Sequence, residues 1–344
     1  MNARASTWAG AKVALQAARG ADGRYVPLAL TISLFVAVAT AGSIHYDHFL
    51  SPQVFLNLLI DNAFLCIVAT GMTFVILTGG IDLSVGAVVA FTTMVSAQLV
   101  EHDGQSPLLV IPLVLAIGAL FGAAQGLLVQ RFKLQPFIVT LAGMFLMRGL
   151  CYLISTESIA ITNPFYSWVA QARVPVWPDA SLSVNAIIAI VVVLAATWLA
   201  QRTQFGRTVY AIGGNELSAH LMGLPVGATV VRVYMLSGFC AALAGVVVTF
   251  YMLSGYSLHA VGLELDAIAA VVIGGTLLRG GVGFVPGTLV GVLILGLIQT
   301  LIAFQGTLSS WWTRIAVGVL LFLFCLLQRF FETRRKGAGQ SQRR

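Results

Sequence analysis

The sequence contains few charged residues. Only 9% of its 344 residues are Asp, Glu, Lys or Arg, whereas 58% are apolar; a typical soluble domain carries roughly 25% charged residues. The apolar residues form continuous runs of about 20 residues, the length that crosses about 30 Å of hydrocarbon as a helix. Barrel strands would alternate instead. The composition therefore excludes an ordinary soluble enzyme and predicts an all-α polytopic membrane protein.

The sequence also lacks the motifs of several functional classes. It has no Gly-x-x-x-x-Gly-Lys-Ser/Thr loop, so any ATP chemistry must come from another chain. Its four cysteines lie singly in apolar runs, which predicts buried thiols and neither disulfides nor metal ligands. The basic residues behind the net charge of +7 do not alternate with aromatic residues, so nucleic acid is not an expected partner. No nucleophile and base converge, and no enzymatic activity is predicted.

About ten apolar segments are predicted to cross the membrane as helices. One or more are expected to be short or broken; the eighth resembles a half-helix packed inside protein. The transmembrane domain would cover residues 25–330, between a cytoplasmic segment at 1–24 and a cytoplasmic tail at 331–344. The first segment is expected to be retained, because no small-residue cleavage signal follows it. The predicted segments are 25–43, 55–77, 83–100, 108–130, 136–155, 185–201, 232–253, 266–279, 286–305 and 311–328.

Basic residues predict the orientation, because Lys and Arg accumulate in cytoplasmic loops. Ten crossings place both termini on the inner side. Arg148, Arg173 and Arg314 are the exceptions to this pattern. The other 16 of the 19 Lys and Arg residues fall inside, namely Arg4, Lys12, Arg19, Arg24, Arg131, Lys133, Arg202, Arg207, Arg232, Arg279, Arg329, Arg334, Arg335, Lys336, Arg343 and Arg344.

A polar, glycine-containing stretch, Thr78-Gly79-Gly80-Ile81-Asp82-Leu83-Ser84-Val85-Gly86, separates the second and third segments. Asp82 or Ser84 can cap the helix that follows, since a carboxylate suits the positive helix end. Alternatively, a broken helix here lines a polar cavity with Asp82 facing the path, because carboxylates inside membranes are costly and often functional. Both interpretations can hold, and Thr78, Asp82 and Ser84 are candidate residues of a substrate path.

Asn57, Asp61 and Asn62 form a second polar group on one helical segment. Asn57 and Asp61 are one turn apart and can share a face. Such groups could bind the hydroxyls of a sugar, or could make hydrogen bonds between helices. Arg148, near the outer end of the fifth segment, would snorkel to the headgroups or pair with Asp61 or Glu157.

The loop at 206–224 is cytoplasmic by charge. Asn215 is predicted to cap a short helix and Gly223 to end it. The helix would carry an apolar stripe that packs either on the protein's own bundle or in the groove of a soluble partner. The stripe consists of Leu217, Leu221 and Leu224.

A fourth stretch runs from Glu264 to Thr276. Glu264 and Asp266 lie at an outer helix start, where capping is their expected role. Asp82 and this stretch have similar spacing from their glycine pairs, Gly79-Gly80 and Gly274-Gly275. This similarity suggests a duplicated unit.

Three separated motifs resemble the ribose/galactose-type permeases of bacterial ATP-binding-cassette (ABC) sugar importers: Thr78 to Gly86, Tyr210-Ala211-Ile212-Gly213-Gly214-Asn215, and Ala270-Val271-Val272-Ile273-Gly274-Gly275-Thr276. The resemblance extends from about residue 27 to 330. Within the family the chain is most similar to the galactofuranose-type permease, through Asp61-Asn62-Ala63-Phe64-Leu65, Thr140-Leu141-Ala142-Gly143-Met144-Phe145 and Gly306-Thr307-Leu308-Ser309-Ser310-Trp311-Trp312.

This resemblance implies a monosaccharide importer in the bacterial cytoplasmic membrane. The expected partners are two cytoplasmic ATPase domains that use ATP and Mg, a second permease subunit and a periplasmic sugar-binding protein. The resemblance implies a heterodimer of two related permeases in preference to a homodimer. The spacing of Glu216 and Gly223 is similar to the Glu-Ala-Ala…Gly coupling motif, although Leu217 and Ser218 replace the alanines. The residues expected to contact the ATPase are Gly213, Gly214, Asn215, Glu216, Leu217, Leu221 and Gly223.

The expected mechanism is alternating access of a helical bundle around a central path. The alternative is an ion-coupled secondary carrier, which would also use broken helices near the midplane. That carrier would need a cation relay, for which Asp61 and Asp82 are the candidates.

Overall fold

The computed structural model describes residues 26–46, 49, 51–178, 180–306, 311–324 and 326, without the side chains of 26–28. In this part of the chain, each of the ten predicted apolar segments contains a helix. Six helices have the length and composition of membrane spans, and a bent pair makes a seventh if it counts as one span. The fold is therefore all-α and polytopic, while ten crossings and cytoplasmic termini stay predictions. The predicted terminal segments, 1–24 and 331–344, lie outside the described residues.

The helices are α2 (Val26–His45), α3 (Pro52–Asp61), α4 (Ala63–Leu77), α5 (Val85–Ala97), the π-helix η1 (Gln98–His102), α6 (Pro107–Arg131), α7 (Pro136–Ile154), α8 (Pro164–Gln171), α9 (Val184–Arg202), α10 (Gln204–Gly214), α11 (Glu216–Leu221), α12 (Val226–Met252), α13 (Leu263–Ile273), α14 (Val285–Gln305) and a last helix, Trp311–Phe324. The strands are β1 (Ile159–Ala160), β2 (Arg173–Trp177), β3 (Ala180–Ser183) and β4 (Ser254–Gly255).

Most predicted boundaries hold to within a few residues. The eighth segment is indeed short, since α13 has 11 residues. The seventh begins earlier than predicted, at Val226 instead of 232. Residues 226–231 contain no charge and no proline, so the helix continues through them toward the end of the bundle.

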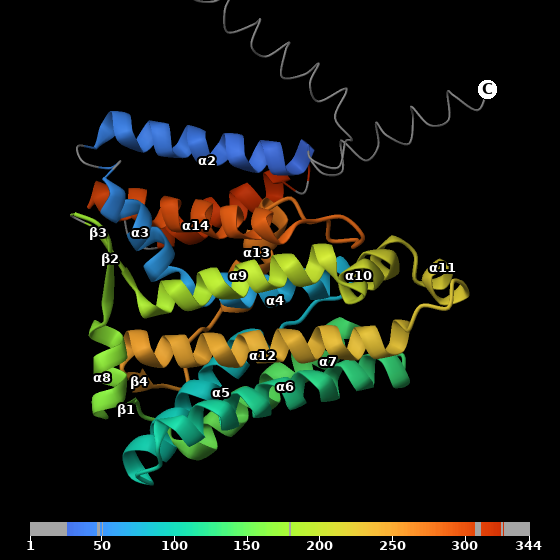
Figure 1. The fold of residues 1–344 in the computed structure, drawn as a ribbon, viewed down its shortest axis with the longest axis horizontal. Helices are drawn as coiled ribbons and strands as arrows, with labels where there is room; N and C mark the ends of the chain where they lie inside the picture. The colour runs from blue at the N-terminus through green and yellow to red at the C-terminus, as the bar shows by residue number, and fades with distance from the viewer. Residues whose placement is uncertain are drawn as a thin grey trace, which may run out of the picture.

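Helix α4 lies at the centre of the bundle (Figure 1). It packs against α9, α12, α13 and α14, and 14 of its 15 residues are buried. The two ends of the bundle differ (Figure 1): α8 and the strand pairs β1–β4 and β2–β3 lie at one end, and α10 and α11 lie at the other. This arrangement separates the loops predicted to be external from the loop predicted to be cytoplasmic.

Glycines bring α6 and α12 together. Gly118, Gly122 and Gly126 recur every fourth residue on α6 and face α12. A Cβ atom on Gly122 would clash with the carbonyl of Tyr234, and one on Gly118 would clash with the carbonyl of Gly238. Lipid supplies no hydrophobic force between helices, so close backbone approach through small residues holds such pairs together.

The second predicted segment is broken where no break was expected. Helices α3 and α4 meet at Asn62 with a bend of 60°. The Asn62 amide donates to the Leu58 carbonyl at 2.9 Å and lies against Gly296 of α14. The polar side chain thus occupies the bend and satisfies a carbonyl there, which is how helix interruptions persist inside a bundle.

Helices α4 and α13 end in the same way. Gly79 and Gly275 have φ of 81° and 91°, the left-handed region that favours glycine. The amide of Gly80 donates to Val75 at 3.0 Å, and the amide of Thr276 donates to Val271 at 3.2 Å. The glycine pairs noticed in the sequence therefore mark equivalent helix ends, in agreement with a duplicated unit.

Candidate functional site

Asp82 is buried in a hydrogen-bond network and is only 1% exposed. Its Oδ1 accepts from the Ser84 amide at 3.0 Å and the Ser84 hydroxyl at 2.7 Å. Its Oδ2 accepts from Ser237 of α12 at 2.7 Å. Asp82 thus accepts the amide of Ser84, the N-cap residue of α5, although Ser84 makes no side-chain capping hydrogen bond of its own, and Asp82 also ties the loop after α4 to α12. In this conformation Asp82 and Ser84 face protein, so a path role for them stays a prediction that requires the loop to move.

The other polar candidates separate into two groups. Asn57 and Asp61 are exposed on one face, as their spacing predicts. Asn57 accepts from Gln53 at 2.7 Å, and Asp61 accepts from the Tyr251 hydroxyl at 3.2 Å. Asn62 is buried at the bend, and Thr78 donates to the Val75 carbonyl at the end of α4. Of these four side chains, only those of Asn57 and Asp61 are exposed in this conformation.

Arg148 pairs with neither of its predicted acidic partners. Its Nη1 donates to the backbone carbonyls of Ser257 at 2.5 Å and His259 at 2.9 Å. The expected ion pair with Asp61 or Glu157 is therefore wrong. These carbonyls belong to a non-helical segment, and the several donors of an arginine allow one side chain to bond two of them at once.

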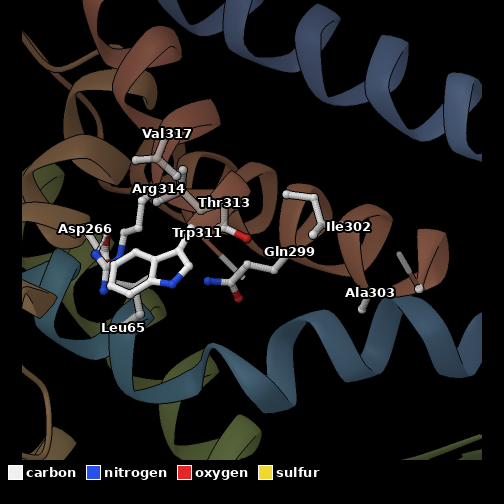
Figure 2. Close-up of a pocket in the computed structure, with 11 residues that line it drawn as sticks. Leu65, Asp266, Gln299, Ile302, Ala303, Trp311, Thr313, Arg314 and Val317 are labelled. Carbon is white, nitrogen blue, oxygen red and sulfur yellow. Dashed lines mark hydrogen bonds and ion pairs between the residues drawn. The ribbon is translucent and has the colours of Figure 1, made fainter. Parts of the chain in front are cut away.

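A cavity of about 620 Å³ opens between α4, α13, α14 and the last helix. Arg314 donates to both carboxylate oxygens of Asp266, at 2.9 and 3.0 Å. Figure 2 shows the Trp311 ring beside this pair, with the Gln299 amide next to it. An aromatic ring, an amide and an ion pair around a space of this size suit a small polyhydroxylated ligand.

Sequence reasoning did not identify this cavity. The sequence places Trp311 only in a motif of the family resemblance and predicts Asp266 only as a cap. Arg314 did carry a signal, because it is one of three basic residues outside the inner loops. An arginine in such a position needs a partner, and Asp266 is that partner.

Helix α11 forms at the opposite end of the bundle, as the sequence predicts. Asn215 caps it by accepting the Ser218 amide at 2.7 Å. Gly223, with φ of 75°, follows the helix end and reverses the chain. Leu217 and Leu221 are 69% and 78% exposed, so they do not pack on the bundle. Leu224 does pack there and is not part of the exposed stripe.

A second cavity, of about 580 Å³, lies beside α11. Lys133, after α6, comes within 3.8 Å of Glu216 at its edge. The cavity and the two exposed leucines together form an apolar surface with a charged rim. Its lining consists of Gln130, Lys133, Glu216, Leu217, His220, Leu224, Pro225, Val226, Gly227 and Ala228.

Gly213 is half-buried, and core atoms fill the space that a side chain there would occupy, whereas its predicted contact with a partner stays a prediction. A Cβ atom there would clash with the Leu77 carbonyl and the Gly281 amide. That amide donates to the same carbonyl at 2.9 Å, and Tyr210 of α10 donates to Gly283 at 2.8 Å. Gly214, by contrast, has open space around it. The end of α10 therefore touches both the end of α4 and the loop that follows α13.

Comparisons with known proteins match most of the chain. The family described as branched-chain amino acid transport system / permease component matches residues 54–325. The Escherichia coli inner membrane ABC transporter permease protein YjfF is 54% identical over 89% of this chain and 92% of its own length. The Bifidobacterium longum fructose import permease FruG is 40% identical over 90% and 92%. The Escherichia coli ribose import permease RbsC is 37% identical over 86% and 91%. No solved structure matches significantly.

We expect Asp82→Ala to lower the free energy of unfolding by about 3 kcal/mol, because buried partners left unsatisfied cost roughly 1–3 kcal/mol each. Asp82→Asn should cost less, since its Oδ1 keeps both Ser84 hydrogen bonds. The measurement is thermal unfolding in detergent, with Asp61→Ala, at an exposed carboxylate, as the control. An Asp82→Ala protein as stable as the parent would contradict the anchoring role.

Proposed function

The chain belongs to the permease family of ABC importers and is the transmembrane subunit of a monosaccharide importer, and we propose that its sugar is of the galactofuranose, ribose or galactose class. The resemblance to galactofuranose-type permeases supports the first of these. The relatives named for their sugars carry fructose, ribose and D-allose. Pentoses and hexoses are small enough to fit the 620 Å³ cavity.

The chain is not an enzyme. Its relatives are import permeases, in which ATP hydrolysis belongs to separate ATPase subunits, and they lie in the cytoplasmic membrane. A relay for ion coupling would need accessible carboxylates. Asp82 is enclosed by Ser84 and Ser237, so only the exposed Asp61, which accepts from Tyr251, is accessible, and one carboxylate of the two leaves a relay incomplete. ATP coupling is therefore favoured over the ion-coupled alternative.

The surface formed by α11 and its neighbouring cavity is the proposed docking site for the ATPase. Exposed leucines on a short helix fit a hydrophobic groove on a partner. Helix α11 lies at the end of the bundle where inner loops are predicted, so a cytoplasmic ATPase can reach it (Figure 1). Asn215 and Gly223 shape this helix, while Glu216, Leu217 and Leu221 are the proposed contact residues.

The contact at Gly213 gives the proposed route from the ATPase to the path. A movement of α10 would press on the end of α4 through the Leu77 carbonyl. Helix α4 continues into the Asp82 loop, which is bonded to α12. A displacement at the docking surface therefore acts on two central helices, as alternating access requires.

The outer cavity is the proposed entrance of the sugar path. It contains the Asp266–Arg314 pair and the Trp311 ring (Figure 2). A periplasmic binding protein would release sugar at this entrance. A second permease, related to this chain, would complete the path.

We expect the neighbouring genes to encode an ATPase, a second permease and a secreted binding protein. Proteoliposomes containing these partners should take up galactofuranose-type sugar, ribose or galactose only when ATP is supplied to the ATPase. Uptake should persist when an ionophore abolishes the membrane potential. Uptake that requires the potential and ignores ATP would establish the ion-coupled carrier.

The double substitution Leu217→Asp/Leu221→Asp should weaken copurification of the ATPase at least tenfold, because two desolvated leucines of about 1.5–3 kcal/mol each are lost. The matched control is Val176→Asp, which places the same charge at an exposed aliphatic position at the other end of the bundle. Copurification equal to the parent would contradict docking at α11.

Gly213→Ala should uncouple ATP hydrolysis from uptake, since the added methyl group separates α10 from the Leu77 carbonyl. Gly214→Ala is the matched control, because its Cβ meets no atom within 4 Å. The measurement is sugar transported per ATP hydrolysed, with bound ATPase quantified in parallel. Equal coupling ratios for the two variants would contradict the route through Gly213.

A further inference from the structure

A closed network of polar side chains joins the loop after α4 to two helices. Its members are Asp82 and Ser84 of the loop, Gln125 of α6 and Ser237 of α12. Each is at most 3% exposed. Within such a network each hydrogen bond places one hydrogen between its two atoms, so the hydrogens can be counted against the hydrogen bonds.

The network contains one hydrogen bond more than its donors can supply. Oδ1 of Asp82 lies 3.0 Å from the Ser84 amide and 2.7 Å from the Ser84 hydroxyl, and Oδ2 lies 2.7 Å from the Ser237 hydroxyl. The Ser84 hydroxyl also lies 3.1 Å from Oε1 of Gln125. To donate to both oxygens, this hydroxyl would need two hydrogens, and it carries one. One further hydrogen must come from another group.

A proton on Asp82 supplies this hydrogen. The carboxyl group then donates through Oδ1 to the Ser84 hydroxyl, which in turn donates to Oε1 of Gln125. The Ser237 hydroxyl still donates to Oδ2, and Oδ1 still accepts the Ser84 amide, because a protonated carboxyl oxygen keeps acceptor capacity. Every hydrogen bond in the network then has its own hydrogen.

Turning the Gln125 amide is the other source of the hydrogen. Its NH2 group would then face Ser84, and Asp82 would stay ionised. That arrangement encloses a negative charge, and among the described residues no lysine, arginine or histidine pairs with Asp82. With Asp82 protonated, the group left without a partner is only the neutral Nε2 of Gln125. An unpaired neutral group costs far less to bury than an unpaired charge.

The other groups around the loop do not take the place of a cation. Helix α5 directs its positive end toward the loop, but α4 directs its negative end toward the same loop. The first turn of α5 also faces a second carboxylate, since a Cβ atom on Gly86 would clash with Oε2 of Glu264 from α13. On α12, the Tyr234 hydroxyl donates to the Ile81 carbonyl at 3.5 Å, and α7 contributes a threonine hydroxyl to that carbonyl. A neutral Asp82 therefore fits these surroundings better than an ionised one.

We propose that Asp82 is a proton-binding site that is occupied in this conformation, and that the neutral carboxyl holds the loop after α4 against α6 and α12. The site is enclosed, so its proton is held and is not relayed across the membrane. If the loop leaves α12, the carboxyl meets water, where an aspartate ionises at about pH 4. That movement releases one proton to the medium, so a lower pH favours the closed loop.

The first test detects the proton by infrared spectroscopy of the full transporter in lipid at neutral pH, with aspartate isotopically labelled at the carboxyl carbon. The labelled parent should show the C=O band of a protonated carboxylic acid, and Asp82→Asn should remove it. Asp61→Asn, at an exposed carboxylate, is the matched control and should leave the band unchanged. A labelled parent without this band would overturn the proposal, whether or not the variants fold. So would a band that Asp82→Asn leaves in place.

The second test measures reversible unfolding of the full chain in mixed micelles between about pH 5 and 7, where an aspartate in water is ionised. The folded parent holds one proton more than the unfolded chain. Its folding equilibrium constant, relative to that of Asp82→Asn, should therefore fall about tenfold for each unit of rising pH. Asp61→Asn should follow the parent. Parallel pH profiles of the parent and Asp82→Asn would show that Asp82 is ionised in the folded protein and would overturn the proposal.

Discussion

The architecture depends on the requirement that every backbone amide and carbonyl inside the membrane find a partner. Continuous helices meet it by themselves, but this chain breaks several helices near the centre of the bundle. The breaks are tolerated because they satisfy one another. The carbonyl of Leu77 at the end of α4 accepts the amide of Gly281 from the loop after α13. Glycine at these positions lets the two backbones come close enough to bond.

The same contact connects α10, which leads to α11, with α4 and the Asp82 loop. Helix α10 ends against the Leu77 carbonyl, and α4 leads to Asp82, whose carboxylate is bonded to α12. Packed helices shift between discrete arrangements and do not deform continuously. In the proposed function, a partner docked on α11 would act on helix ends that already touch the core, and no long flexible linker would have to transmit the movement.

The non-helical segment between α12 and α13 is held in place by charged side chains. Arg148 and Arg314 hold the segment between α12 and α13 from two sides, one through carbonyls and one through Asp266. A guanidinium has five donors in a rigid fork, so one side chain can satisfy several acceptors at once. These contacts hold a non-helical segment next to the 620 Å³ cavity, whose lining includes Asp266 and Arg314.

Local signals in the sequence determined much of this protein. Apolar runs located the helices because length and hydropathy are local properties, and Asn215 and Gly223 marked the ends of α11 because caps depend on adjacent residues. Three motifs identified the family. Only the tertiary structure decided the bend at Asn62, the burial of Asp82, the inward position of Gly213 and the pairing of Arg314 with Asp266. Each of these depends on atoms from helices distant in sequence, whose approach is set by packing, and a pattern along one segment carries no information about its neighbour.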